Sequence, residues 1–276
     1  MKLVRDIVYD TRHGNALDLY LPQSLSAKAC IVFISGQGFQ SVRRDDPAAG
    51  YFAKELTEAG FAVASISCRR RVGEGAFSQA DAEAIALGSK RSRQAGLRLS
   101  PRLTSYGYMA AMEDLSTAIG FVRREAENLG LLTCETGVLG VSAGAVAALG
   151  LAYPPAKWAR RLHKPDAVVA IAGAVAQPWC LDGCHPPCLM FNGMQDPEID
   201  MRDALMAAER ADRIGVPLHL VDMGASGHPS IIDGVLDGWD EKGRKYLDML
   251  LGQFEILLPE KAYFYGDGYG QVAASV

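Results

Sequence analysis

The sequence lacks both a marked excess of one charge and a long hydrophobic run. Its 28 Lys and Arg residues and 32 Asp and Glu residues leave a net charge of −4, so the composition indicates no nucleic-acid partner. The longest apolar runs, 30–35 and 167–176, are too short to span a bilayer. The first residues lack the apolar core of a secretory signal. This favours a cytoplasmic protein, although a trimmed mature form would look the same.

Cysteine is also sparse, and six in 276 residues are too few for a disulfide scaffold. Cys30, Cys68 and Cys134 lie in apolar, strand-like runs, where a free thiol behaves as a small hydrophobe. The other three cysteines fall within 180–188 at a spacing that matches no common zinc pattern. We therefore expect a loop leading into a buried strand there, with no metal and no cofactor. A disulfide between the first two of these cysteines stays open for a secreted protein.

Eight runs rich in β-branched and apolar residues predict strands along the chain. The predicted strands are Leu3–Tyr9, Ala16–Leu21, Ala29–Ser35, Ala62–Ser67, Thr136–Val141, Ala167–Ala172, Cys188–Phe191 and Leu218–Asp222. The first two flank the turn-rich residues 12–15 and therefore predict an antiparallel hairpin. The later runs are almost continuously apolar, as expected of parallel strands that are covered on both faces.

Helical patterns alternate with these strands from residue 29 onward. The predicted helices are Ala48–Ala59, Tyr106–Leu129, Ala143–Leu151, Asp200–Ile214 and Pro229–Leu251. This alternation predicts an α/β fold: an eight-stranded, mostly parallel sheet with an antiparallel N-terminal hairpin and helices on both faces. No internal repeat or linker divides the sequence, so we expect residues 1–276 to form a single domain.

Two segments fall outside this alternation. Residues 72–103 are polar and carry several arginines, and their middle, Gln79–Leu97, has the composition of a helix. That helix is either a lid over the site or a solvated surface insertion. The tail 259–276 is rich in Gly and Tyr. Three roles are open for it: wrapping the body, contributing to a homodimer contact, or staying disordered.

The segment 140–144, Gly-Val-Ser-Ala-Gly, has the pattern of a nucleophilic serine. A catalytic serine must project from a sharp strand-to-helix turn, and small neighbours make that turn possible. An apolar run precedes the segment, and the helix-compatible residues 145–149 follow it. Motif and context together predict Ser142 as the nucleophile.

A serine hydroxyl needs a histidine to accept its proton and a carboxylate to orient that histidine. In proteins with this turn, the carboxylate and then the histidine follow the serine along the chain. Two histidines lie in the last third of the sequence. His219 falls within an apolar, strand-like run, whereas His228 follows a loop just past the last predicted strand. We therefore predict His228 as the base.

Four carboxylates compete to be the acid. Asp196 lies on the loop after the strand 188–191, at the end of the sheet where α/β proteins gather functional groups. Asp200 suits the N-cap of the next helix. Glu198 is expected to be exposed, and Asp222 ends the last strand. The sequence favours Asp196.

The oxyanion formed during catalysis needs backbone N–H donors. One is expected from Ala143, directly after the nucleophile, and another from the loop after the third strand. That loop, 35–39, contains two glycines that allow close approach to a substrate. We expect the amides of Gln37 and Gly38 to take part.

Together these elements resemble the α/β-hydrolase superfamily, in particular its carboxylesterase branch related to hormone-sensitive lipase and the small feruloyl and acetyl esterases. The segments that carry the resemblance are Leu17–Pro22, Ile34–Phe39, Glu113–Leu115 and 140–144. Ile34–Phe39 corresponds to the His-Gly-Gly-Gly loop of that branch, with Ser35 in the position of the histidine and Gln37 in that of a glycine. Arg69 keeps the arginine of an Asp-Tyr-Arg segment, and its expected partner is Asp114.

The resemblance implies hydrolysis of a small carboxylic ester, the small-molecule partner, through an acyl-enzyme on Ser142. An amidase, formamidase or peptidase would use the same three side chains. A non-catalytic ligand-binding protein can have the same fold. Such a protein usually lacks one of the three residues, and this sequence has a candidate for each.

Overall fold

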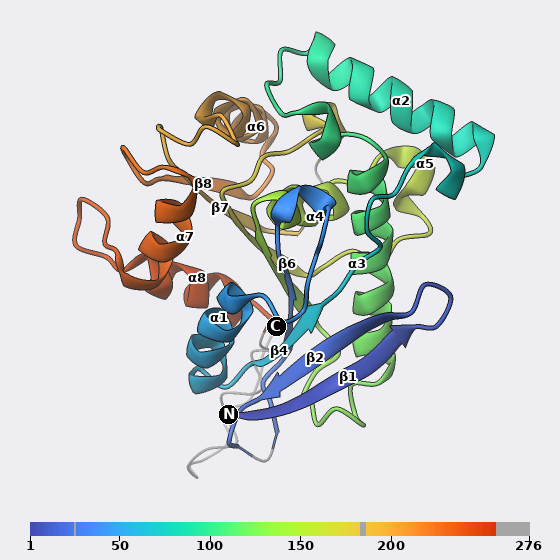
Figure 1. The fold of residues 1–276 in the computed structure, drawn as a ribbon. Helices are drawn as coiled ribbons and strands as arrows, with labels where there is room; N and C mark the ends of the chain where they lie inside the picture. Colours follow the sequence, from blue (N-terminus) through green and yellow to red (C-terminus); the bar gives the residue numbers. More distant parts are fainter. Residues whose placement is uncertain (25, 183–185, 258–276) are drawn as a thin grey trace, which may run out of the picture.

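One eight-stranded sheet forms the centre of the protein (Figure 1). The computed structural model describes residues 1–24, 26–182 and 186–257. The strands are β1 (Lys2–Asp10), β2 (Asn15–Leu21), β3 (Cys30–Ile34), β4 (Ala62–Ile66), β5 (Thr136–Val141), β6 (Ala167–Ile171), β7 (Cys188–Asn192) and β8 (Leu218–Asp222). Their order in the sheet is β1-β2-β4-β3-β5-β6-β7-β8. The hairpin β1–β2 and the pair β2–β4 are antiparallel, and the pairs from β4 to β8 are parallel.

Eight helices and four short 3-10 turns connect the described strands. The helices are α1 (Pro47–Glu58), α2 (Gln79–Gln94), α3 (Tyr106–Arg124), α4 (Ala143–Ala152), α5 (Ala156–Ala159), α6 (Met201–Ile214), α7 (His228–Asp237) and α8 (Tyr246–Glu255). The 3-10 turns are η1 (Gln37–Phe39), η2 (Glu74–Ala76), η3 (Pro101–Leu103) and η4 (Pro178–Cys180). In the described part of the chain, no helix is both long and apolar enough to cross a membrane.

The sheet separates two hydrophobic layers. Along β3, Val32 and Ile34 pack into the layer of α3, α4 and α6, while Ile31 and Phe33 pack into that of α1, α7 and α8. Successive strand residues point to opposite faces, so a strand covered on both sides is apolar throughout. The predicted fold class, including the helices on both faces, is therefore confirmed.

Three local predictions are wrong. The helix predicted over 229–251 is two helices, because the extended Gly238 ends α7 and a turn through Gly243 (φ 74°) precedes α8. The helix predicted to reach residue 129 ends at Arg124. Cys134 lies exposed in a loop, whereas Cys30 and Cys68 are buried as expected. Its neighbours are threonine and glutamate, and they do not continue an apolar run.

The insertion at 72–103 contains α2, which packs beside α3 at the top of Figure 1. Its buried face combines Ala82 and Ile85 with two serines. The Ser92 hydroxyl donates to the Ala176 carbonyl (2.7 Å), and Ser89 Oγ lies 2.8 Å from Thr104 Oγ1. These contacts anchor α2 to the segment after β6 and to η3. Whether α2 acts as a lid stays a prediction, and the tail 259–276 lies outside the described residues.

Candidate active site

Ser142 occupies a sharp turn between β5 and α4. Its backbone has φ 56° and ψ −125°, a region that costs a residue with a side chain about 1–3 kcal/mol. Two hydrogen bonds hold this conformation: the Ser142 amide donates to the Ile171 carbonyl (2.8 Å), and its carbonyl accepts from the Val146 amide (3.1 Å). The turn therefore connects the sheet to the first turn of α4.

The two glycines that flank the serine have no room for a side chain. A Cβ on Gly140 would lie 2.6 Å from the Gly144 carbonyl oxygen, and one on Gly144 would collide with the Ile34 carbonyl oxygen. Protein interiors are packed so densely that such overlaps require the backbone to move. The small residues of the motif are thus required by the approach of β3, β5 and α4.

Three side chains meet at this turn. His228 Nε2 lies 2.8 Å from Ser142 Oγ, and His228 Nδ1 lies 2.7 Å from Asp196 Oδ2. The serine follows β5, the aspartate follows β7, and the histidine begins α7 after β8. The Asp196 side chain is fully buried, and that of His228 is 16% exposed. The structure thus brings the predicted nucleophile, acid and base into one hydrogen-bonded chain.

Asp196 is held on both oxygens. Its Oδ1 accepts the amides of Glu198 (2.8 Å) and Ile199 (3.0 Å), which leaves Oδ2 for the histidine. Hydrogen bonds to both oxygens fix the carboxylate's orientation, and a fixed carboxylate in turn fixes the imidazole. The backbone of the loop therefore preorganises the contact with His228.

The competing carboxylates have other contacts. Asp200 caps α6 through the Arg202 amide (2.9 Å), as predicted, and pairs with Arg98 (2.8 Å). The hydrogen bond from the Arg202 amide, together with Arg98, lowers the pKa of Asp200. Glu198 is exposed, and Asp222 accepts the Gly224 amide (2.8 Å).

The loops that carry the aspartate and the histidine are joined by their backbones. The Met194 amide donates to the Gly224 carbonyl (2.7 Å), and the Gln195 amide donates to the Ser226 carbonyl (3.3 Å). A Cβ on Gly193 would collide with the Ser226 carbonyl oxygen, so this glycine sets the approach of the two loops. The role of Gly193 was not predicted, because only its position directly after a predicted strand distinguishes it in the sequence. His219 lies exposed on β8, away from this contact.

The loop after β3 lies directly against the serine. A Cβ on Gly36 would be 2.5 Å from Ser142 Cβ and 3.0 Å from Ser142 Oγ. The next three residues, Gln37, Gly38 and Phe39, all have positive φ (53°, 58° and 62°). Such a run is costly for residues with side chains and marks a backbone held in place for a purpose. Sequence reasoning included Gly36 in the loop but missed its contact with the serine.

Side chains on the loop hold this left-handed turn in place. The Gln37 amide group donates to Asp46 Oδ2 (3.0 Å), and its oxygen accepts a hydrogen bond from Ser41. Ser35, which replaces a histidine in the branch that the sequence resembles, accepts the Arg43 amide on its hydroxyl (3.3 Å). Ser35 and Gln37, which differ from the residues of that branch, thus both form hydrogen bonds that stabilise the loop.

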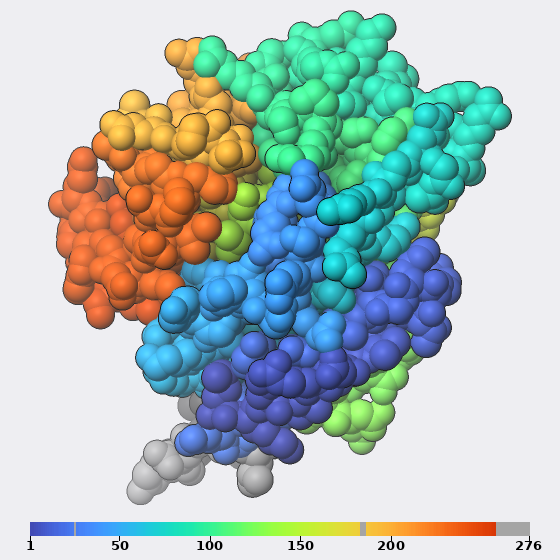
Figure 2. All heavy atoms as spheres, viewed as in Figure 1, coloured from blue at the N-terminus to red at the C-terminus, as the bar shows by residue number. Residues whose placement is uncertain are grey.

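The two segments that contact Ser142, the η1 loop and the start of α4, carry backbone N–H groups without partners among the described residues. Ala143 is the first residue of α4, where an amide has no acceptor within the helix. The amides of Gln37 and Gly38 donate to no other described residue, whereas that of Phe39 donates back to Gly36 (3.4 Å). Free amides and the positive end of a helix favour an anion in this position. Figure 2 shows the surface hollowed between the η1 loop, in blue, and α7, in orange.

The predicted partner of Arg69 is confirmed. Its Nε lies 2.8 Å from Asp114 Oδ1, and its Nη2 lies 2.8 Å from Glu113 Oε2. Burial raises the pKa of Asp114, and the guanidinium beside it acts in the opposite direction. This ion pair ties α3 to the segment after β4.

The cysteine-containing segment falls partly outside the described residues, since 183–185 are not described. Cys188 is buried in β7 and Cys180 ends η4. Across 1–24, 26–182 and 186–257, no group of three His, Cys, Asp or Glu side chains is arranged to hold a metal ion.

No protein-family model and no curated protein matches the sequence. Solved structures do match. A truncated carbohydrate esterase from gut microbiota is 17% identical, with 93% of this chain and 96% of that chain covered and a TM-score of 0.65. MGS-M1, an alpha/beta hydrolase enzyme from a Medee basin deep-sea metagenome library, is 16% identical, with 93% and 98% covered and a TM-score of 0.62.

A third structure, the butyrate-bound esterase 2 of the planctomycete Thermogutta terrifontis, is 17% identical, with 95% of each chain covered and a TM-score of 0.61. The same esterase also matches in a form phosphorylated by paraoxon. At this level of identity the likeness concerns the fold. Combined with the sheet order and the turn between β5 and α4, it shows that the chain has the α/β-hydrolase fold.

Proposed function

We propose that the protein is a serine hydrolase that cleaves small carboxylic esters, with Ser142 as nucleophile, His228 as general base and Asp196 as its orienting acid. The observation that carries the proposal is the chain of two hydrogen bonds from Asp196 through His228 to Ser142, at 2.7 and 2.8 Å. A serine within hydrogen-bond reach of a histidine that a carboxylate orients supports these roles.

The first half-reaction forms an acyl-enzyme. Ser142 Oγ attacks the ester carbonyl carbon while its proton passes to His228 Nε2. Asp196 stabilises the resulting imidazolium through Nδ1–H. The oxyanion accepts hydrogen bonds from the amides of Ala143, Gln37 and Gly38, and each such donor typically contributes about 10²–10³ in rate. The carbon–oxygen bond then breaks, and the leaving alkoxide takes the proton from His228.

The second half-reaction releases the acid. Water gives a proton to His228 as its oxygen attacks the acyl carbon of Ser142. The same amides hold the second oxyanion, and collapse of this intermediate returns the proton to Ser142 Oγ. The fully buried Asp196 keeps the imidazole in the tautomer that both steps need.

Ester substrates are favoured over amides because the neighbours named above include a carbohydrate esterase and an esterase bound to butyrate. A matched pair of substrates tests this preference: p-nitrophenyl acetate and p-nitroacetanilide share an acyl group and differ in the bond that is cleaved. If the enzyme turned over the anilide faster than the ester, the protein would be an amidase and the proposal of an esterase would be wrong.

A fluorophosphonate probe tests the nucleophile directly, since it reacts with activated serines. We expect it to label the folded wild type and not Ser142→Ala. A folded wild type that stays unlabelled, or equal labelling of the variant, contradicts the proposal. A cytoplasmic location and a homodimer stay predictions from the sequence, and light scattering in solution tests the second.

A further inference from the structure

The far side of the η1 turn borders a second hollow of about 600 Å³. Segments 38–40, 71–72 and 101–107 contribute to its wall. In Figure 2 the blue, cyan and green segments with these residues meet beside the tip of the η1 loop. Two arginines, Arg71 and Arg102, line this hollow, and no Asp or Glu of the described residues does so.

Arg102 lies flat against the turn that borders Ser142. Its guanidinium carbon is 2.8 Å from where a Cβ on Gly38 would be, so the guanidinium uses the space that this glycine leaves. Gly38 follows Gly36 by two residues, at most about 7.6 Å between their Cα atoms. Gly36 in turn packs on Ser142. Ser142 and Arg102 therefore contact the same short loop, at positions two residues apart.

The charges of this hollow are not neutralised. Two other arginines are paired: Arg43 with Asp45 (2.7 Å), and Arg44 with Asp18 (3.0 Å). Arg71 and Arg102, by contrast, make no ion pair or hydrogen bond through their guanidinium groups with any other residue in the described ranges. Two unpaired cations around one concave surface favour an anion between them.

The N-terminus of α3 adds to this positive field. The helix has 19 residues and begins at Tyr106, and residues 105–107 line the hollow. The Ser105 side chain makes no capping hydrogen bond, and the first turn of α3 has no acidic residue. Helices α1, α2 and α6 are each capped by a side chain, from Asp46, Ser78 and Asp200. The helix dipole here therefore has the same sign as the arginines and acts on the same space.

We propose that this hollow is a subsite for the carboxylate of an anionic ester, with Arg102 as its main ligand and Arg71 as a second. The proposal rests on the proposed function, because it names the substrate class of the same site. A guanidinium binds a carboxylate with two parallel hydrogen bonds, a geometry that glutamine cannot reproduce. The subsite would thus select esters with a carboxylate a few bonds away from the scissile group.

Two pairs of esters test the subsite from the two sides of the scissile bond. On the alcohol side, 4-carboxyphenyl acetate is compared with its methyl ester at the benzoate. On the acyl side, mono-4-nitrophenyl adipate is compared with its methyl ester. The readout is the ratio of kcat/KM for the anionic ester to that for its neutral partner. The pair that responds shows which side of the substrate carries the anion.

We expect Arg102→Gln to lower this ratio at least ten-fold in one pair, mainly through KM, and Arg71→Gln to lower it about three-fold. The matched control is Arg160→Gln, at an exposed arginine that ends α5. This control should leave the ratio at its wild-type value. A ratio that Arg102→Gln leaves unchanged in both pairs overturns the subsite.

Calorimetry separates this proposal from the proposed function, since binding needs no turnover. In the Ser142→Ala background, 4-hydroxybenzoate and adipate are titrated beside their methyl esters. Arg102→Gln should raise the Kd of one of the two carboxylates at least ten-fold and that of its methyl ester by less. If neither carboxylate binds more tightly than its ester, the subsite is wrong, even for an active esterase. If hydrolysis does not depend on Ser142 but carboxylate binding depends on Arg102, the proposed function fails and the anion site stands.

Discussion

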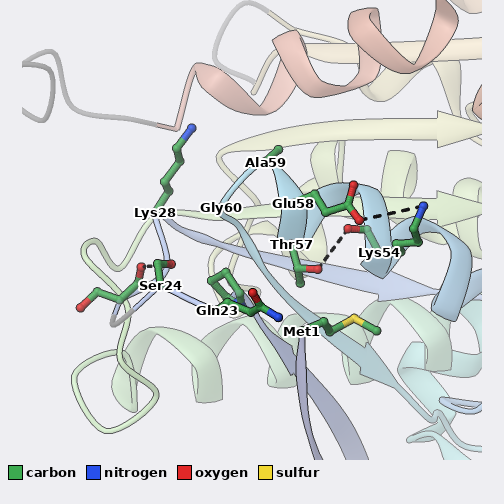
Figure 3. A pocket seen from close by; sticks show the side chains of 11 residues that line it. Met1, Gln23, Ser24, Lys28, Lys54, Thr57, Glu58, Ala59 and Gly60 are labelled. Atoms are coloured by element: carbon green, nitrogen blue, oxygen red, sulfur yellow. Dashed lines mark hydrogen bonds and ion pairs between the residues drawn. The ribbon is translucent and has the colours of Figure 1, made fainter.

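The two ends of the central sheet both carry hollows, and they are built differently. At the carboxyl end, Ser142, His228 and Asp196 form a chain of hydrogen bonds, and glycines bring the loops that carry them into contact. At the amino end, a groove of about 670 Å³ lies beside the start of β3 and the end of α1 (Figure 3). Charged side chains on its wall form surface ion pairs, including Lys28 with Glu255 (3.4 Å) and Lys54 with Glu58 (3.9 Å). The two hollows differ in the number of polar side chains that hydrogen bonds hold in place.

The topology explains this difference. Strands β3 to β8 run parallel to one another, so their carboxyl ends reach the same edge of the sheet and their following loops converge there. Ser142, Asp196 and His228 follow three different strands and meet at that edge. The amino ends of β4, β5, β6 and β8 follow the helices α1, α3, α5 and α6 and lie at the opposite edge.

The largest expected effect comes from Ser142→Ala at the carboxyl end. Removal of the nucleophile should lower kcat/KM for p-nitrophenyl acetate by about 10⁴-fold or more. The melting temperature should change little, because the backbone hydrogen bonds of the turn do not involve the hydroxyl. If the variant kept activity within ten-fold of wild type, another residue would have to be the nucleophile.

Asp196→Asn should lower kcat by about 10⁴-fold, because an amide stabilises the wrong imidazole tautomer. Asp200→Ala is the matched control on the same loop. It removes the N-cap of α6 and should cost about 1 kcal/mol of unfolding free energy, with kcat nearly unchanged. Urea unfolding and steady-state kinetics on both variants measure this. The reverse pattern would make Asp200 the acid.

Gly36→Ala tests the contact between the η1 loop and the serine. The added Cβ would lie 2.5 Å from Ser142 Cβ, and a displacement of about 1 Å at the reacting atoms typically costs on the order of 10²-fold in kcat. Gly50→Ala, in α1, is its control, because a Cβ there meets nothing within 4 Å. That control should raise the unfolding free energy by about 0.5–1 kcal/mol through helix propensity and leave kcat alone. Equal activity of the two variants would show that the η1 loop shifts to accommodate the added methyl group without displacing Ser142.

The smallest effect is expected at the amino-end groove. Lys28→Ala removes an ion pair between two partly exposed side chains, and such pairs contribute about 0–1 kcal/mol. Ester hydrolysis should be unchanged. A loss of activity on this substitution would break the contrast between the two ends of the sheet.

Much of the fold was predictable from the sequence, because strands covered on both faces must be apolar along their whole length. The eight strands were predicted with boundaries that differ by at most one residue at either end. Helix ends were harder to predict. The prediction of one helix over 229–251 overlooked Gly238 and the charged segment 240–245, which separate α7 from α8.

Ser142 was marked in the sequence by the motif around it, since a sharp turn needs small residues next to one another in the chain. The choice among Asp196, Glu198, Asp200 and Asp222 had no comparable local signal, and only the fold brings Asp196 to His228.

The sequence by itself determined the α/β architecture and the position of the strand-to-helix turn, since both depend on neighbouring residues. Only the tertiary structure decided the left-handed η1 turn against Ser142 and the unpaired arginines beside it. These features come from segments far apart in the chain, and their geometry exists only after the sheet has aligned its carboxyl ends.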